Sequence, residues 1–436
     1  MTESNTLGDL WEYDVTKILA TFLAIYAGYV VMGLISGLPT RGIVATLVQL
    51  TLLIALYAML TLALNLQWGY TGLFNIGIVG FMAVGAYTML MVSKPPVDPS
   101  SAAAASQIGG LGLPVIVGIL AGVIAAALLG FVVALPALRL RADYLAITTI
   151  AMSEIVRFIF LSSSFQEFSV FGNKIGTGGG RGLIVNFEEP ISRIFFDTGA
   201  YEGLVTAVNE AMGVQGTMAP VVDTAVISVV LLVVVAGYFW LFKRTGESPF
   251  GRVLKAIRED EDVARALGKN TNRFKIKSFM LGCALMGLAG AFYAMYFLGA
   301  VNPTAFKPQF TFFVWVALII GGSGSNTGSV IGSAIFVGVL FQGPLYMKNV
   351  VEALFTVASA PPSFAHALSG IGPFIAYMFE NISHFRIIAL GIVLIVLMKR
   401  RPDGIMGHRK ETAASIPLIK LSGYGRDAAA DGGDAE

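Results

Sequence analysis

The sequence predicts an all-α polytopic membrane protein with about ten transmembrane segments in two inverted five-helix halves. Of its 436 residues, 56% are hydrophobic and only 13% are charged, and the mean hydropathy is +0.75. Soluble globular chains carry about 25% charged residues, so the composition excludes an ordinary soluble domain. Apolar runs long enough to cross a bilayer recur along the chain, and Lys and Arg gather in a few of the links between them.

Ten apolar runs meet or approach the roughly 20 residues that a bilayer-crossing helix needs. They are residues 16–37, 43–67, 70–92, 113–135, 143–162, 221–242, 276–298, 310–322, 325–342 and 385–399. Two of the ten are short. The N-terminus is acidic and lacks the basic start of a secretory signal, so the first run is expected to be retained as a span.

The orientation follows from three clusters of Lys and Arg near the span ends. They lie between spans four and five, between spans six and seven, and after the last span. Ten crossings with both termini inside place all three in the cytoplasm, and the two halves then begin on opposite faces, as in an inverted repeat. The expected divisions are a cytoplasmic N-terminus 1–15, a first transmembrane half 16–162, an external loop 163–220, a second transmembrane half 221–399 with a cytoplasmic helix 249–268, and a cytoplasmic tail 400–436.

The third span is rich in glycine and reads WGYTGLFNIGIVGFMAVGAY at residues 68–87. Its glycines, Gly72 and Gly77 among them, do not fall on one helix face, which indicates close approach by several neighbours or a locally broken helix. A broken helix can direct backbone dipoles and the Asn75 amide at a substrate near the midplane. The alternative is that the glycines only permit tight packing and that Asn75 bonds across helices.

A second glycine-rich stretch, GGSGSNTGSVIG at residues 321–332, is a degenerate counterpart in the second half. Gly324, Gly328 and Gly332 recur at a spacing of four, the pattern of close helix packing. Asn326 occupies the place of Asn75, so we expect it to belong to the same pathway. A tight turn between two short helices is the competing interpretation.

Residues 249–268 predict one cytoplasmic amphipathic helix, or two short ones joined near Asp260. Ser248 is a good N-cap, Pro249 suits the first turn, and Gly268 suits the residue after the end. Apolar residues recur near helical spacing, and Glu259 and Asp262 belong to an acidic run. That run would be repelled by anionic lipid, so docking into a protein groove is favoured over a position on the lipid headgroups.

Several stretches resemble the branched-chain amino acid ABC-transporter permeases of the LivH/LivM family, and the LivM type most closely. GRVLKAIREDEDVARALGKNTNRFKIKSFMLGCALMGLAGAFYA (251–294) is similar to their cytoplasmic loop and following helix. DVARALG (262–268) fits a looser form of the E-A-A-x-x-x-G signature and departs from it at Asp262 and Val263. The third span, LRLRADYLAITTIAMSEIVR (138–157), TGGGRGL (177–183) and KRRPDGIMG (399–407) extend the resemblance over most of residues 45–407.

The resemblance implies a pore-forming permease subunit of an amino-acid importer in the cell membrane. A second, LivH-like permease subunit, two ATPase subunits and an external substrate-binding protein would be its partners. ATPase coupling is expected at Arg258, Glu259, Asp262, Ala264 and Gly268, and the substrate pathway at Gly72, Asn75, Gly77 and Asn326. ATP and Mg²⁺ would be used by the partner ATPases and no cofactor by this chain, which lacks the phosphate-loop motif. No catalytic residue, metal site or nucleic-acid partner is expected, and Cys283, the single cysteine, cannot form an internal disulfide.

Three alternatives remain open at this stage. The same architecture could carry urea or another small solute. An ion-coupled secondary transporter would need no ATPase, but Glu154 and Arg157, the membrane-depth charges of the first half, lie one turn apart. They are expected either to pair or to lie at the outer part of the span, whereas a coupling site usually needs a more exposed intramembrane acid. A structural membrane scaffold would leave the glycine-rich spans unexplained. Neighbouring genes for two ATPases and a binding protein would discriminate among these classes.

Overall fold

The computed structural model describes residues 14–97, 108–137, 142–170, 172–185, 199–212, 218–354 and 360–406. The sequence-based predictions for residues 1–13 and for the tail beyond residue 406 lie outside these ranges. Within the described ranges, nine helices are long and apolar enough to cross a membrane, and a tenth apolar helix is shorter. The predicted all-α polytopic class is confirmed.

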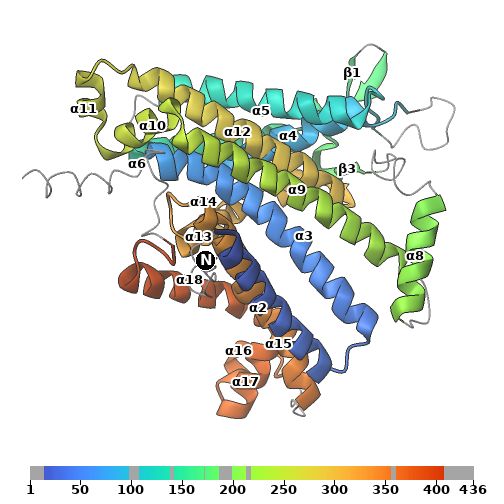
Figure 1. Ribbon diagram of the computed structural model, residues 1–436. Helices are drawn as coiled ribbons and strands as arrows, with labels where there is room; N and C mark the ends of the chain where they lie inside the picture. The colour runs from blue at the N-terminus through green and yellow to red at the C-terminus, as the bar shows by residue number, and fades with distance from the viewer. Residues whose placement is uncertain are drawn as a thin grey trace, which may run out of the picture.

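In its described residues, the first half contains four helices long enough to span a membrane and the shorter apolar helix α4 (Figure 1). They are α2 (Asp14–Ile35), α3 (Thr40–Leu64), α4 (Ile78–Ser93), α5 (Val115–Ala137) and α6 (Ala142–Leu161). A π-helical turn, η1 (Asn65–Tyr70), extends α3, and the chain then leaves helical geometry. The third span was predicted from residue 70, but it begins at Ile78, because Gly72 adopts a φ of 74° that a continuing α-helix cannot accommodate.

The second half begins with α9 (Ala219–Glu247) and the two short helices α10 (Pro249–Glu259) and α11 (Glu261–Ala266). Its remaining helices are α12 (Thr271–Tyr296), η4 (Pro303–Ala305), α13 (Pro308–Gly321), α14 (Asn326–Ile335), η5 (Phe336–Phe341), α15 (Gly343–Leu354), α16 (Phe364–Ala367), α17 (Ile371–Glu380) and α18 (Ile382–Arg400). The span predicted at 325–342 extends to Leu354, because the π-helical turn η5 carries α14 on into α15.

The segment between α6 and α9 forms small elements at the opposite end of the molecule from α10 and α11 (Figure 1). They are α7 (Ser163–Gln166), β1 (Phe168–Val170), β2 (Asn173–Ile175), η2 (Gly179–Arg181), β3 (Leu183–Ile184) and α8 (Gly199–Met212). β1 pairs with β2, and β3 pairs with β4 (Ala300–Val301), both antiparallel. Thr177 Oγ1 donates to the carbonyl of Phe160 at 2.7 Å, and Asn302 Nδ2 donates to that of Gly180 at 2.8 Å. These contacts hold the loop against the ends of α6 and α12.

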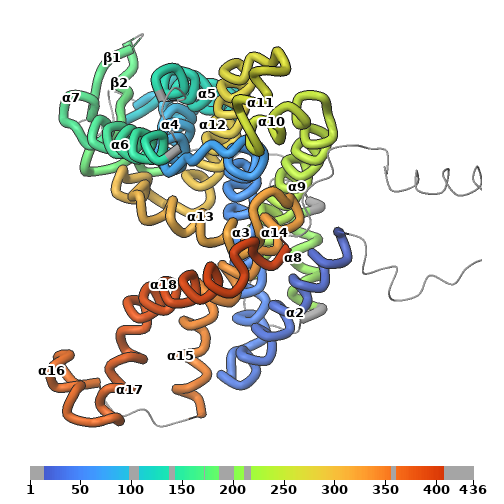
Figure 2. Tube along the Cα trace, turned by 90° about the vertical axis from the view of Figure 1, so that its left-hand side faces the viewer, coloured from blue at the N-terminus to red at the C-terminus, as the bar shows by residue number. Residues whose placement is uncertain are grey.

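The neighbours of each helix follow the pattern that an inverted repeat predicts. In the first half α4 and α5 pack on each other and on α12, the second span of the second half. In the second half α13 and α14 pack on each other and on α3, the second span of the first half. Each half therefore contributes one helix to the other, and the spans interlock rather than forming two separate bundles (Figures 1 and 2).

Glycine allows the backbones of α4, α5 and α12 to approach closely. A Cβ added at Gly85 would lie 2.6 Å from the Cα of Gly287, and one at Gly290 would lie 2.5 Å from the Cα of Met82. In a membrane, van der Waals packing and interhelical hydrogen bonds replace the hydrophobic effect as the force between helices, so close contact of this kind stabilises the fold.

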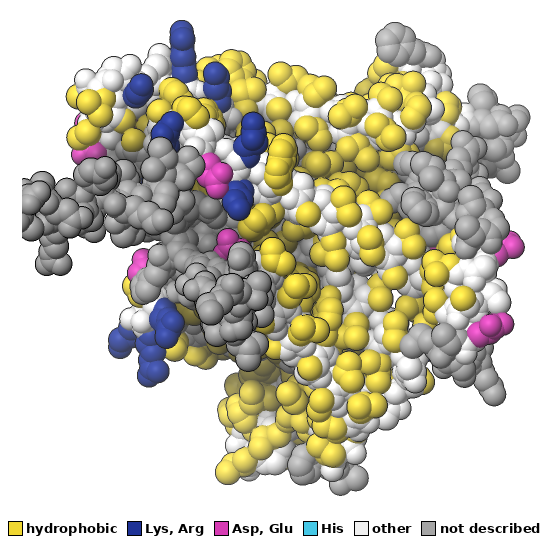
Figure 3. Space-filling view, viewed as in Figure 1, with side chains coloured by type: hydrophobic (Ala, Val, Ile, Leu, Met, Phe, Trp, Pro, Cys, Tyr) yellow, Lys and Arg dark blue, Asp and Glu magenta, His cyan; other side chains and the backbone are white. Residues whose placement is uncertain are grey.

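The outer helices present apolar side chains over most of the molecular surface. Leu23 on α2, Ile124 on α5 and Ile395 on α18 are all exposed. Figure 3 shows hydrophobic side chains covering the bodies of the helices, while Lys and Arg gather at the end that carries α10 and α11 and at the end of α18. Such a surface suits lipid tails along its length and headgroups at the basic end.

Candidate functional site

The break between η1 and α4 is the first component of the site. Asn75 connects its two sides, because its Nδ2 donates to Gln67 Oε1 at 2.8 Å and its Oδ1 accepts from the Gly77 N–H at 2.8 Å. The Leu73 N–H also returns to the carbonyl of Gln67 at 2.8 Å. The break is thus a defined, hydrogen-bonded loop, and the broken-helix interpretation of the third span is confirmed.

Asn75 itself is fully buried. Trp315 Nε1 donates to its carbonyl at 3.0 Å, and its amide faces Gln67 and Met286. In this conformation its hydrogen bonds cross between elements, as in the packing interpretation. That Asn75 faces a substrate during transport remains a prediction.

A cavity of about 430 Å³ lies beside the break, between η1, α13 and α18. Its walls include Trp68, Phe74, Ile76, Trp315, Leu394 and Met398. The rings of Phe74 and Trp315 meet edge to face at 4.7 Å between centroids, and those of Trp68 and Phe74 lie 5.1 Å apart. Sequence reasoning concentrated on the glycines and Asn75 and missed this aromatic wall, although Trp68 and Phe74 flank the same motif.

The turn between α13 and α14 is the second component, and it meets the first. Gly324 has a φ of 93°, and its N–H donates to Asn65 Oδ1 at 2.7 Å. Asn326 is fully buried; it accepts from Asn65 Nδ2 at 3.1 Å and donates to the Tyr70 hydroxyl at 2.8 Å. A polar network therefore connects the two glycine-rich stretches of the two halves.

The predicted glycine spacing is confirmed at two of its three positions. A Cβ on Gly328 or on Gly332 would lie 2.6 Å from a backbone atom of Gly321, so both face α13. Gly324 lies in the turn before α14 instead. The stretch is thus both a tight turn and a close helix contact.

The segment 249–268 forms two helices joined at Asp260, the second of the two predicted arrangements. Ser248 Oγ accepts from the Gly251 N–H at 3.2 Å, and Asp260 Oδ1 accepts from the N–H groups of Asp262 and Val263 at 2.9 and 3.0 Å. Gly268 follows α11 with a φ of 76°. The predicted N-cap at Ser248 and the predicted glycine end at Gly268 are therefore present, and Asp260 caps the second helix.

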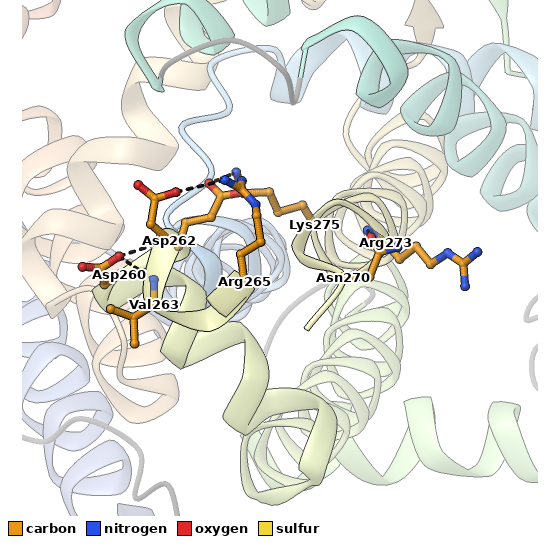
Figure 4. Close-up of polar contacts among 8 residues, drawn as sticks. Asp260, Asp262, Val263, Arg265, Asn270, Arg273 and Lys275 are labelled. Carbon is orange, nitrogen blue, oxygen red and sulfur yellow. Dashed lines mark hydrogen bonds and ion pairs between the residues drawn. The ribbon is translucent and has the colours of Figure 1, made fainter. Parts of the chain in front are cut away.

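Ion pairs hold α11 against the start of α12 (Figure 4). Arg265 meets Glu261 at 3.1 Å and Asp262 at 3.0 Å, and Lys275 on α12 pairs with Glu261. Burial alone would raise the pKa of Glu261, but the hydrogen bond and charge of Lys275, with Arg265, lower it overall. The carboxylate form is thus favoured where the two helices meet.

The two faces of α10–α11 differ in exposure. Leu254, Ile257 and Ala264 are buried within this chain, Ala264 with only 3% of its surface exposed. Val263 is 55% exposed and Leu267 73% exposed. Ala264 thus packs against the chain's own core, and its place in the ATPase contact stays a prediction. Glu259, Asp262 and Gly268 do lie on the exposed surface.

Arg258 lies between the segment and the two breaks. Its Nη1 donates to the carbonyl of Gly69 in η1. A Cβ on Gly72 would lie 3.6 Å from its side chain, and a Cβ on Gly324 would lie 3.0 Å from Nη1. One turn earlier, Lys255 lies over the Tyr70 ring at 5.3 Å. The helix α10 therefore contacts both broken stretches directly.

The structure also places the Glu154–Arg157 pair and the possible metal-ligating side chains. Glu154 and Arg157 pair, with Nη2 and Oε2 2.5 Å apart. Among the described residues, no three His, Cys, Asp or Glu side chains are grouped so that they could hold a metal ion.

Comparison with known proteins places the chain. Residues 46–378 match the family model of the branched-chain amino acid transport system permease component. The high-affinity branched-chain amino acid transport system permease protein LivM of Escherichia coli K12 is 31% identical over 294 residues, which cover 66% of this chain and 62% of that protein. The probable branched-chain amino acid transport permease protein LivM of Methanocaldococcus jannaschii is 29% identical over 322 residues, 69% of this chain and 81% of that protein.

The high-affinity branched-chain amino acid transport system permease protein LivH of Salmonella typhimurium gives a shorter match. It is 35% identical over 89 residues, which cover 20% of this chain and 28% of that protein. No solved structure matches significantly. The chain spans about three fifths of the length of the E. coli relative. The family match itself covers well over half of the chain, and the ten apolar helices with their broken spans agree with it. This protein therefore belongs to the family of branched-chain amino acid transport system permease components.

Proposed function

We propose that this chain is a membrane-spanning subunit of an ATP-driven importer of branched-chain amino acids. The observation that carries the proposal is the direct contact of α10 with both broken stretches beside an apolar cavity, in a chain of this family. A soluble partner that moves α10 would thereby move the walls of the cavity. The relatives named above are permease proteins of branched-chain amino acid systems, which supports the substrate class.

The partners follow from the same proposal. A second, LivH-like permease subunit would complete the pathway, and an external binding protein would deliver the amino acid. Two ATPase subunits would bind the permease pair, one of them at the α10–α11 surface of this chain. ATP and Mg²⁺ would act in the ATPase subunits. The ion-coupled alternative has little support, because the Glu154 carboxylate is already paired with Arg157.

In the proposed cycle, the contacts of α10 with η1 and with the turn before α14 carry motion from the ATPase to the cavity. Closure of the ATPase pair would press on the exposed side of α11 and displace α10. Arg258 and Lys255 would pass that displacement to η1 and to the turn before α14, and the cavity beside Trp315 would change its access. Such a shift requires the partner to bind the two conformations with different affinities.

We expect the purified permease–ATPase complex to hydrolyse ATP faster when leucine-loaded binding protein is added.

The proposed orientation places α10–α11 in the cytoplasm and residues 163–220 outside. In a Cys283→Ala background, Lys174→Cys and Lys269→Cys should react with an impermeant thiol reagent from opposite sides of the membrane. Lys174 lies on β2 and Lys269 just after α11, and both are exposed. Reaction of both variants from one side would refute the ten-span orientation.

Arg258→Gln should uncouple ATP hydrolysis from uptake by about tenfold while the ATPase still binds. Glutamine cannot reach the Gly69 carbonyl with a charged donor, and a charge-assisted hydrogen bond contributes about 1.5–3 kcal/mol. Arg252→Gln is the matched control, because Arg252 lies on the same helix but is exposed. The ratio of leucine taken up to ATP hydrolysed in proteoliposomes measures the effect. Equal ratios for the two variants would exclude Arg258 as the connection.

A further inference from the structure

Arg386 is a charged residue within the last span, α18, for which the proposed function has so far no use. Charged side chains inside a membrane are costly and usually pair with one another or mark a functional site. Arg157 pairs with Glu154, and Lys348 pairs with Glu352 and Glu380. No carboxylate in the described part of the chain forms an ion pair with Arg386.

Neutral groups hold the Arg386 side chain in place. Its Nη1 donates to the carbonyl of Phe341 at 2.6 Å, and its guanidinium carbon lies 4.1 Å from the centre of the Phe341 ring. Phe341 ends the π-helical turn η5, and such turns are frequent at functional sites. Nε is buried without any hydrogen-bond partner. The side chain is therefore positioned, but its charge is not neutralised and one donor remains free.

Arg386 belongs to the inward stripe of α18. Leu390, Leu394 and Met398 follow it at intervals of four residues and so share its face of the helix. Leu390 is buried, and the other two line the 430 Å³ cavity. The lipid-exposed side of α18 carries Ile388, Ile392 and Ile395 instead. Arg386 thus faces α13 and η5 rather than the surrounding lipid.

The face of α18 that carries Arg386 also carries Leu394 and Met398, which line the cavity between α13 and α18. These two helices contact each other and lie close together in Figure 2. Eight residues of α18 separate Arg386 from Leu394, a distance of about 12 Å along the helix. Beside Arg386, the Phe341 ring lies 5.5 Å from that of Phe313 on α13, and both rings are only half-buried. A guanidinium and a half-buried pair of aromatic rings therefore meet near the start of α18.

We propose that Arg386 binds the carboxylate of the amino acid as it passes between α13 and α18. Arg presents planar paired donors that match a carboxylate, and the exposed edges of Phe313 and Phe341 would receive an apolar side chain. A zwitterion leaving water needs a partner for its carboxylate, and Arg386 needs a counter-charge. This inference rests on the proposed function, because it assumes an amino-acid substrate.

The first test compares leucine uptake by proteoliposomes that hold the complete transporter. Arg386→Gln should lower uptake at least tenfold. The KM for leucine-loaded binding protein should stay nearly unchanged, because the binding protein docks before leucine reaches Arg386. Arg386→Lys should retain part of the activity. Arg400→Gln, an exposed charge at the end of the same helix, is the control and should match the wild type. Co-purified ATPase confirms that each variant assembles.

The second test restores the charge chemically. Arg386→Cys in a Cys283→Ala background should gain uptake after modification with an aminoethyl thiosulfonate and none with the sulfonatoethyl reagent. Excess leucine should slow both modifications. No protection by leucine, or equal rescue by both reagents, would overturn the proposal even if Arg386→Gln fails to assemble.

Lipid binding is the main competing role for this arginine. Vesicles of phosphatidylcholine with and without phosphatidylglycerol distinguish it: a lipid role predicts that Arg386→Gln removes a dependence on the anionic lipid and leaves uptake otherwise normal. That result would refute carboxylate binding. Absence of ATP-dependent leucine uptake by the wild type would refute the proposed function itself, whereas normal uptake by Arg386→Gln would refute only the role of Arg386.

Discussion

Replacing Gly77 by leucine is expected to abolish the folded permease. Gly77 precedes α4 and faces the backbone of α6: a Cβ there would lie 2.9 Å from the carbonyl carbon of Thr149 and closer still to its oxygen. The Ile76 N–H donates to Thr149 Oγ1 at 3.0 Å, and this hydrogen bond fixes the backbone next to Gly77 against α6. No side-chain rotation can relieve a clash with backbone, and overpacking of well-packed sites costs about 1–3 kcal/mol or more. Leucine adds three carbons beyond that Cβ, so we expect a loss of stability of about 3 kcal/mol or more.

The measurement is the yield of monodisperse protein in detergent and its thermal unfolding midpoint. Gly237→Leu is the matched control, because Gly237 on α9 is exposed and no atom lies within 4 Å of an added Cβ. We expect the control to behave as the wild type. Normal yield and midpoint for Gly77→Leu would show that α4 and α6 are not in contact at the break.

Leu267→Asp is expected to release the ATPase subunits from the permease. Leu267 is 73% exposed in this chain, next to the half-exposed Val263 on the same segment, and an apolar pair of this kind suits a groove on a soluble partner. A charge forced into such an interface without a partner costs several kcal/mol, and each 1.4 kcal/mol weakens binding about tenfold. We therefore expect at least a hundredfold loss of affinity.

Co-purification of ATPase with the detergent-solubilised permease measures this loss. Lys269→Ala is the control, because an exposed charge contributes only about 0–1 kcal/mol. Ala264→Asp and Gly268→Asp are less informative: the first would place a carboxylate in the chain's own core, and the second would force an L residue to a φ of 76°. Wild-type co-purification of Leu267→Asp would instead favour a position of α11 on the lipid surface.

The fold was largely predictable because length and apolarity decide which segments can span a bilayer. All ten predicted segments correspond to helices, and the caps at Ser248 and Gly268 are present. Boundaries failed where helical geometry changes without a change in composition. Gly72, with its φ of 74°, moved the start of the third span to Ile78, and the π-helical turn η5 moved the end of the ninth to Leu354. Hydropathy detects neither change.

The site was less predictable because it depends on contacts across the chain. The sequence indicated that Asn75 and Asn326 matter, but not that Asn65 and Tyr70 would join the two glycine-rich stretches in one network. It predicted residues 249–268 as a docking element, and only the structure shows that Arg258 reaches Gly69. Helix caps and i,i+4 ion pairs could be predicted because the residues involved are neighbours in the sequence. Contacts between residues more than 180 positions apart leave no local sequence pattern, so they could not be predicted.

The central claim is that ATP hydrolysis by partner subunits drives branched-chain amino acid import through this chain. The most direct measurement is uptake of labelled leucine into proteoliposomes that contain the permease pair and its ATPase subunits, with loaded binding protein added. We expect uptake that requires ATP on the side of the membrane that carries the ATPase subunits and that persists when ion gradients are collapsed. Leu267→Asp should stop this uptake. Uptake that proceeds without ATP and follows an imposed proton or sodium gradient would contradict the central claim.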